Sequence, residues 1–215
     1  MPAAPVIPIR IPLSRDEQPV AATISFASHQ DVAALARWRV PALSSRSLRC
    51  RAADAREFAR FSVKRWQHYR DTRTAAQSLH QLQQMIARSP QGEFCFHLKL
   101  EAPWFPAALG CAMIRRTWHH HLALDFLFVH PRVAARLENI KFAGRQLLQA
   151  VCLVAHTIGC PRVWGEATED SAPFYRRYLQ QPVDDQFIIP ADEIAAFAAS
   201  IQSESRRLDD PEIAF

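Results

Sequence analysis

The chain has 215 residues, of which 49% are hydrophobic, and a formal net charge of +5 from 26 basic and 21 acidic residues. That is enough for one domain with a sizeable core, whereas two separate domains would each be small. No apolar run approaches the ~20 residues that a membrane helix needs, which argues against a membrane protein.

The N-terminal part predicts a tail followed by a strand and three helices. Prolines at positions 2, 5, 8, 12 and 19 interrupt any apolar stretch, which argues against a signal peptide. We therefore expect residues 1–20 to form a proline-rich flexible tail and residues 21–215 a single domain. The five cysteines are odd in number and lack paired spacing, so we expect reduced thiols and a cytoplasmic protein. The expected elements are a strand at 22–26 and helices at 30–38, 53–69 and 72–88.

The middle of the chain predicts two antiparallel strands, at 94–100 and 108–116, that follow a Ser89–Gly92 turn. Three consecutive histidines, at positions 119 to 121, come next. Adjacent side chains point in different directions and no accompanying ligand spacing is present, so we expect an exposed hairpin turn and no metal site.

Residues 122–179 form the most informative segment. All residues of 122–129 except Asp125 are hydrophobic, and they predict a buried strand that ends before Pro131. Apolar residues then recur at three- and four-residue spacing from 140 to 158, which predicts a helix packed on a sheet. Another strand follows at 163–167. A helix that returns so quickly to a strand indicates a right-handed crossover between parallel strands.

The order of these features resembles the acyl-coenzyme A binding core of the GNAT superfamily of N-acyltransferases. The matching features are Val129 with Pro131, Gly144 before Leu147 and Leu148, the following strand, and Ser171 before Phe174 and Tyr175. The resemblance implies an α/β (α+β) fold with a mixed, mostly antiparallel central sheet, a parallel splayed strand pair and flanking helices. It also places the acceptor substrate at the helical region 40–90.

The resemblance implies acetyl-coenzyme A, or another acyl-coenzyme A, as co-substrate. The pyrophosphate would bind at the first turn of the long helix, where free amides and the helix dipole favour an anion. The pantetheine arm would pair with the backbone of the preceding strand, unless those residues are simply core. The residues expected at this site are Phe128, Val129, Arg136, Lys141, Phe142, Ala143, Gly144 and Arg145.

Phe142 departs from the family pattern, because the family has glycine at the corresponding position. The ring either crowds the pyrophosphate or points into the core.

Acyl transfer to an amine needs a base for the amine and an acid for the departing thiolate. The resemblance assigns the role of the acid to Tyr175. The alternative is that Tyr175 is a buried aromatic residue with a packing role only. Ser171 is a further candidate catalytic residue of this site, and its alternative role is to cap the N-terminus of the helix that follows. Asp125 and Glu166 are the candidate bases. Period two places Asp125 on the face of Leu127 and Val129, and an acid in an apolar strand would have a raised pKa; a salt bridge or an edge position is the alternative for either carboxylate.

The C-terminal part predicts one strand at 186–189 and a helix at 192–206. Because the family usually adds a second strand here, we expect an open sheet edge that a homodimer would cover.

The function expected from the sequence is transfer of an acetyl or short acyl group to an amine, small molecule or peptide. The alternatives are a binding module with this fold and no catalysis, or a protein that acts on an RNA-linked substrate. Trp66 and Tyr69 lie among basic residues, as in proteins that stack nucleic-acid bases, although their helical spacing favours packing.

Overall fold

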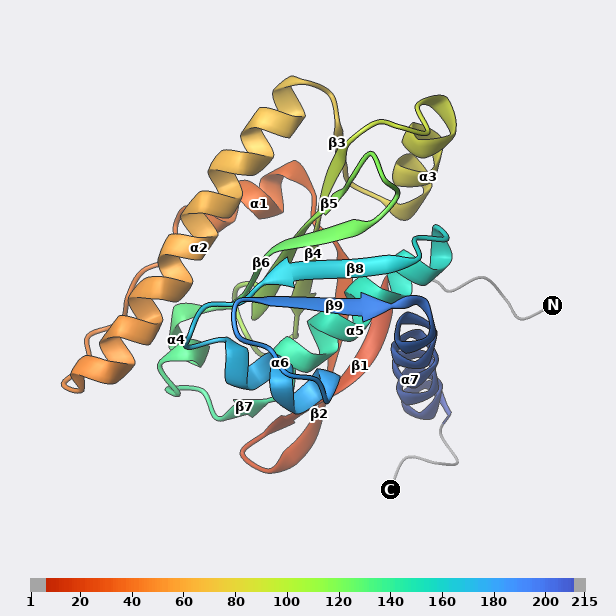
Figure 1. The fold of residues 1–215 in the computed structure, drawn as a ribbon. Coiled ribbons are helices and arrows are strands. Elements are labelled where there is room, and N and C mark those ends of the chain that lie inside the picture. Colours follow the sequence, from red (N-terminus) through yellow and green to blue (C-terminus); the bar gives the residue numbers. More distant parts are fainter. Residues whose placement is uncertain (1–6, 211–215) are drawn as a thin grey trace.

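The computed structural model describes residues 7–210, and a nine-stranded sheet crosses the molecule with helices on both faces (Figure 1). The strand order is β7-β1-β2-β4-β5-β6-β8-β9, and β3 pairs with β4. Most neighbours are antiparallel, while β6–β8 and the two-residue β3–β4 pair are parallel, so the predicted mixed sheet is confirmed. The strands are β1 (Ile9–Arg15), β2 (Gln18–Phe26), β3 (Ala75–Ala76), β4 (Phe94–Glu101), β5 (Gly110–Arg116), β6 (Leu122–Val129), β7 (Ile140–Lys141), β8 (Arg162–Glu166) and β9 (Gln186–Pro190).

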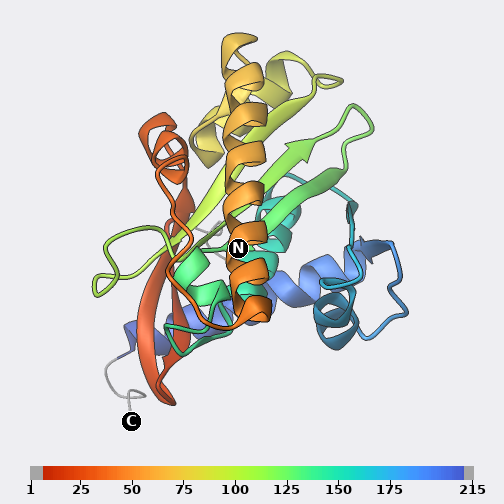
Figure 2. The same ribbon diagram turned by 90° about the vertical axis from the view of Figure 1, so that its left-hand side faces the viewer.

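Two groups of helices cover the two faces of the sheet. Helices α5 and α7 pack together against one face, and residues of α6 join the same hydrophobic cluster. Helices α1 and α2 contribute to the cluster on the other face, where α2 stands upright in front of the sheet in Figure 2. The helices are α1 (His29–Leu35), α2 (Arg46–Asp71), α3 (Leu79–Arg88), α4 (Pro131–Ala134), α5 (Ala143–Thr157), α6 (Ala172–Leu179) and α7 (Ala191–Asp209).

The predicted flexible tail over residues 1–20 is wrong for residues 9–15 and 18–20, which belong to strands β1 and β2; residues 1–6 lie outside the described part. Ile9, Ile11 and Leu13 alternate in sequence and are buried, which provides the free energy that orders the strand. The carbonyl of Pro12 accepts a hydrogen bond from the Gln146 side chain and therefore points away from β2. The nitrogen of Pro12 points to the same side, so its lack of an N–H costs no hydrogen bond with β2.

The helix predicted at 72–88 begins later. Helix α2 continues to Asp71, residues 75–76 pair with β4, and α3 starts after Ser78, whose hydroxyl accepts a hydrogen bond from the Gln81 amide. Trp66 and Tyr69 are buried, so these two rings do not offer a stacking surface for nucleic acid.

All five cysteines are free, and Cys50 alone among them is exposed. Within residues 7–210 no three histidine, cysteine or acidic side chains are grouped as metal ligands, and no helix has the length and apolar composition needed to cross a membrane. Residues 117–121 form the expected turn between β5 and β6. Strand β9 is an edge of the sheet and exposes Ile188, so a homodimer through this edge stays a prediction.

Candidate active site

Two connected cavities lie beside the splayed part of β6, at the start of α5 and along α6. The larger has a volume of about 760 Å³ and is lined by the first residues of α5, and the smaller has a volume of about 440 Å³ and is lined by Asp125, Glu166 and Asp185. The larger cavity offers helix amides and three arginines beside Asp54 and Asp170, whereas the smaller offers carboxylates and is lined by no basic residue. The residues that line both are Phe58, Leu127, Thr168, Ser171 and Tyr175.

The larger cavity includes the gap where β6 and β8 separate. The two strands pair in parallel at Leu122, Ala123 and Leu124, and β8 has no further partner on β6 beyond Gly165. Because the amide of His130 donates to Leu109 of the preceding segment and hydrogen bonds alternate along a strand, Phe128 faces β5 and Val129 faces the gap. Leu127 lies two residues before Val129, so its backbone N–H and C=O also face the gap.

The first turn of α5 is open for an anion. Phe142 stands at the N-cap with a φ of 74° and provides no side-chain cap. The amides of Ala143, Gly144 and Arg145 therefore lack intrahelical partners. The Phe142 ring is 45% exposed and lines the larger cavity, so it does not point into the core. A Cβ at Gly144 would lie 3.1 Å from the ring of Phe174, which shows that this glycine makes room for α6.

The predicted cationic residues divide into two groups. Arg136 is exposed and lines the larger cavity, and no hydrogen bond or ion pair holds its side chain within the described residues. Arg145 also lines this cavity, but it forms a 2.7 Å ion pair with Glu204 of α7. Lys141 pairs with Glu17 at 3.5 Å and does not line the cavity. Arg51 of α2 is an additional exposed cation on the cavity wall.

We expect Phe142→Gly to stabilise the protein slightly and to tighten coenzyme A binding. A left-handed backbone costs a side-chain-bearing residue about 1–2 kcal/mol, and the greater freedom of glycine in the unfolded chain offsets about half of this gain. Removing the exposed ring also opens the amides of α5. Urea unfolding and titration calorimetry with coenzyme A measure the two effects.

Phe142→Ala separates the effect on stability from the effect on binding, because it removes the ring and keeps a side-chain-bearing residue in the left-handed backbone conformation. We expect tighter coenzyme A binding in both variants and a stability gain in the glycine variant alone. Weaker binding in both variants would mean that the ring itself contacts the cofactor.

Tyr175 forms part of the wall between the two cavities. Its side chain is 5% exposed and its ring stacks on Phe187 at a centroid distance of 4.1 Å. Burial raises the pKa of the Tyr175 phenol, because the apolar surroundings disfavour the phenolate. The hydroxyl is therefore protonated at neutral pH and is a proton donor.

Ser171 stands at the N-cap of α6, but it does not cap the helix with its side chain. Its hydroxyl accepts a hydrogen bond from the Thr168 amide at 2.8 Å, and the Ser171 amide donates to the Thr168 hydroxyl. This reciprocal pair fixes the turn at the junction of the two cavities. The hydroxyl is thus engaged within the turn, which favours a structural role over a catalytic one.

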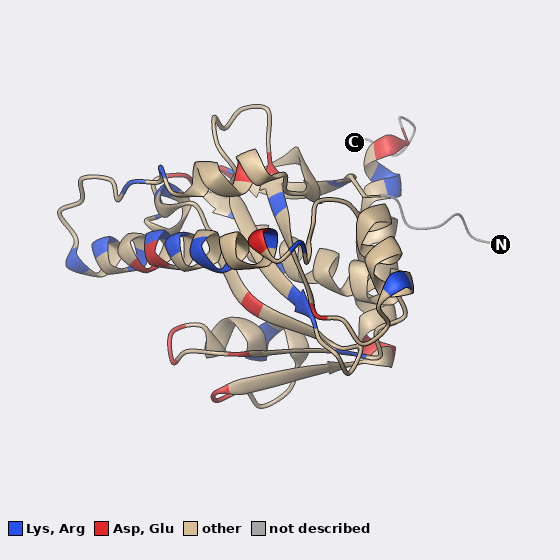
Figure 3. Cartoon of the chain, turned by 90° about the horizontal axis from the view of Figure 1, so that it is seen from above, with Lys and Arg blue, Asp and Glu red and all other residues tan. Residues whose placement is uncertain are grey.

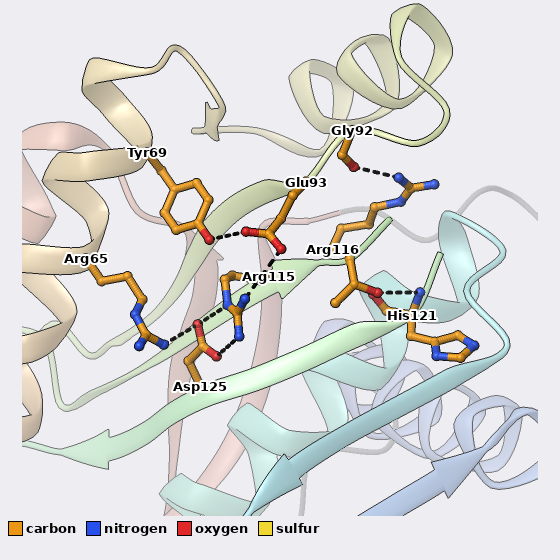
Figure 4. Close-up of polar contacts among 9 residues, drawn as sticks. Arg65, Tyr69, Gly92, Glu93, Arg115, Arg116, His121 and Asp125 are labelled. Atoms are coloured by element: carbon orange, nitrogen blue, oxygen red, sulfur yellow. Dashed lines mark hydrogen bonds and ion pairs between the residues drawn. The ribbon is translucent and has the colours of Figure 1, made fainter. Parts of the chain in front are cut away.

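Asp125 lies in an ion-pair network rather than in an apolar environment (Figure 4). Its two oxygens accept bonds of 2.6 and 2.9 Å from Arg115, and Arg65 of α2 approaches at 2.9 Å. Arg115 also contacts Glu93, which accepts a hydrogen bond from Tyr69. Both carboxylate oxygens of Asp125 are occupied, so its geometry is that of a structural ion pair.

The prediction that Asp125 shares a face with Leu127 and Val129 is wrong. Met113 pairs with Phe126 and Ile114 pairs with Leu124, so Asp125 is the extra residue of a β-bulge. The bulge interrupts the alternation, and Asp125 points toward α2 while Leu127 and Val129 pack on the α5 side.

Glu166 is the open carboxylate of the smaller cavity. It ends β8 and is exposed, and its side chain forms no hydrogen bond or ion pair with the residues that the structure describes. Since a base needs a free lone pair that can reach the substrate, Glu166 fits this role better than Asp125.

Sequence reasoning missed three contributors to the site, namely Arg51, Leu127 and Phe174. Arg51 comes from α2, far away in sequence, and no local pattern marks it. Leu127 could be found only from the hydrogen-bond alternation along β6, and Phe174 was noted as part of a motif without its contact to Gly144.

Comparison with solved structures gives matches among N-acetyltransferases. A PaiA N-acetyltransferase from Thermoplasma acidophilum in complex with coenzyme A matches with 12% identity and a TM-score of 0.46, over 79% of this chain and 98% of that one. Nourseothricin acetyltransferase matches with 14% identity and a TM-score of 0.36, over 45% of this chain and 65% of that one. A GNAT-family acetyltransferase from Staphylococcus aureus matches with 12% identity and a TM-score of 0.34, over 45% and 68% of the two chains.

The matched structures are described as acetyltransferases, and the one from Staphylococcus aureus as a member of the GNAT family. No protein-family model matches the sequence, and comparison with curated proteins gives no significant match. At such identities and TM-scores the structural matches carry nothing about the reaction.

Proposed function

We propose that the protein is an acyl-coenzyme A dependent N-acyltransferase. The observation that carries the proposal is the pair of connected cavities, one suited to a polyanion with an extended arm and the other to an amine, which share Tyr175 as a lining residue.

Coenzyme A fits the larger cavity by the chemistry of its lining. Free amides at the start of α5 and the arginines at positions 51 and 136 suit a pyrophosphate. The gap-facing backbone of Leu127 and Val129 suits the amides of the pantetheine arm. The thioester end of the arm would then lie near Tyr175.

The reaction needs two proton transfers. The acceptor nitrogen attacks the thioester carbonyl, so that a C–N bond forms and the C–S bond breaks. Glu166, directly or through a water molecule, takes the proton that leaves the nitrogen. Tyr175 gives its proton to the departing thiolate and regains one from solvent.

Calorimetry with acetyl-coenzyme A, followed by an assay of free thiol released in the presence of amines, tests the proposal. Binding together with amine-dependent thiol release supports it. No binding at millimolar ligand would instead favour a binding module that has the fold without the chemistry.

We expect Glu166→Gln to lower kcat about 100-fold, because the amide cannot accept the proton. Acetyl-coenzyme A affinity should be unchanged, since Glu166 does not line the larger cavity. Glu169→Gln, a nearby exposed carboxylate that lines neither cavity, is the control and should keep its activity. Equal activities for the two variants would remove Glu166 from the mechanism.

A further inference from the structure

A third cavity continues the site along α2. Its volume is about 520 Å³, and Phe126 lines both this cavity and the smaller acidic one. Phe61, which is 52% exposed, stacks on Phe126 at a centroid distance of 6.4 Å and forms an apolar wall with it. An acceptor whose nitrogen lies near Glu166 could therefore extend over Phe126.

The far side of this third cavity is cationic. Lys64 is exposed and has no ion-pair or hydrogen-bond partner among residues 7–210. Arg65 lies over the Phe126 ring at 5.4 Å and uses one terminal nitrogen for Asp125, while its side chain stays 44% exposed. His68 completes this side. An anionic group in the cavity could therefore bind the ammonium of Lys64 and the nitrogens of Arg65 that do not pair with Asp125.

Helix α2 also concentrates positive charge on this part of the molecule. It carries eight basic and three acidic residues, a net +5 that equals the net charge of the whole chain, so the rest of the chain is balanced. Figure 3 shows the basic positions along the length of the helix. Such a field favours the approach of anions.

We propose that the acceptor is an amine that carries an anionic group, a carboxylate or a phosphate, separated from its nitrogen by an apolar stem. The stem lies on Phe61 and Phe126, and the anion binds Lys64 and the free edge of Arg65. This proposal rests on the proposed function, because it assumes that the nitrogen is acylated beside Glu166.

The test compares hexylamine with 6-aminohexanoate and 6-aminohexyl phosphate as acceptors. We expect kcat/KM for the better anionic acceptor to be about tenfold higher than for hexylamine at low ionic strength, and the advantage to shrink as salt is added. The two anionic acceptors distinguish carboxylate from phosphate. Lys64→Glu should abolish the advantage of the anionic acceptors over hexylamine.

Arg60→Glu is the matched control, since it makes the same charge change on the same helix. Arg60 does not line this cavity and pairs with Glu57. It should keep most of the advantage. Equal use of all three acceptors by the wild-type protein would overturn the inference and leave the proposed function intact.

Calorimetry with the two anionic amines in the absence of coenzyme A gives a second readout. If no amine is acylated but one of them binds and Lys64→Glu abolishes that binding, the proposed function fails and the anion site stands. If neither binds and none is acylated, both proposals fail.

Discussion

Tyr175→Phe should lower kcat about 100-fold or more while acetyl-coenzyme A affinity changes less than about twofold. The substitution removes only the hydroxyl and keeps the ring that stacks on Phe187. Burial raises the pKa of the Tyr175 phenol, so the group keeps its proton at neutral pH. The raised pKa also makes the phenol a weaker acid, so transfer to the thiolate depends on the hydroxyl lying within hydrogen-bond reach of the sulfur. Steady-state kinetics and calorimetry on the same preparation measure the two quantities.

Tyr178→Phe is the matched control for this experiment. Tyr178 lies one turn further along α6, lines the larger cavity only, and packs on Phe174 at a centroid distance of 4.9 Å. It should keep its kcat. A full rate in Tyr175→Phe, or a loss explained by weaker cofactor binding, would remove Tyr175 as the acid.

The crossover from β6 through α5 to β8 could be predicted from the sequence because it is written locally. The apolar stripe of α5 repeats over fifteen residues, and the flanking strands are short buried runs. Such patterns depend only on which residues face a sheet, so a single sequence is enough to recognise them.

The β-bulge at Asp125 could not be predicted in the same way. Its position depends on the register between β5 and β6, which local sequence does not reveal. The partners of Asp125 are also distant in the chain, since Arg115 comes from β5 and Arg65 from α2. The same sequence pattern that indicated a base in an apolar strand therefore describes an ion-paired residue on the opposite face.

Strand β1 was missed for a related reason. Its prolines indicated a tail, and its buried positions gain stability only once β2 and the helices cover them. Arg51 belongs to the same class, because only the packing of α2 brings it to the cavity. Local signals thus identify the central crossover, while the charged parts of the site depend on contacts between distant segments.

Asp125→Asn should lower the free energy of unfolding by about 2–3 kcal/mol. The Asp125 side chain is 6% exposed and forms ion pairs with two guanidinium groups. The neutral amide would leave Arg65 without its carboxylate and Arg115 with Glu93 alone. The loss is smaller than for a fully buried pair because Arg115 is 24% exposed. Urea unfolding with an unchanged m-value is the measurement.

Asp71→Asn is the exposed counterpart, because Asp71 pairs with Arg70 where both side chains are largely in solvent. It should cost less than about 1 kcal/mol. Below its melting temperature Asp125→Asn should keep most of its acyl transfer, in contrast to Glu166→Gln. If Asp125→Asn were as stable as the wild type but inactive, the carboxylate would be acting on the substrate, and Asp125 would replace Glu166 as the base.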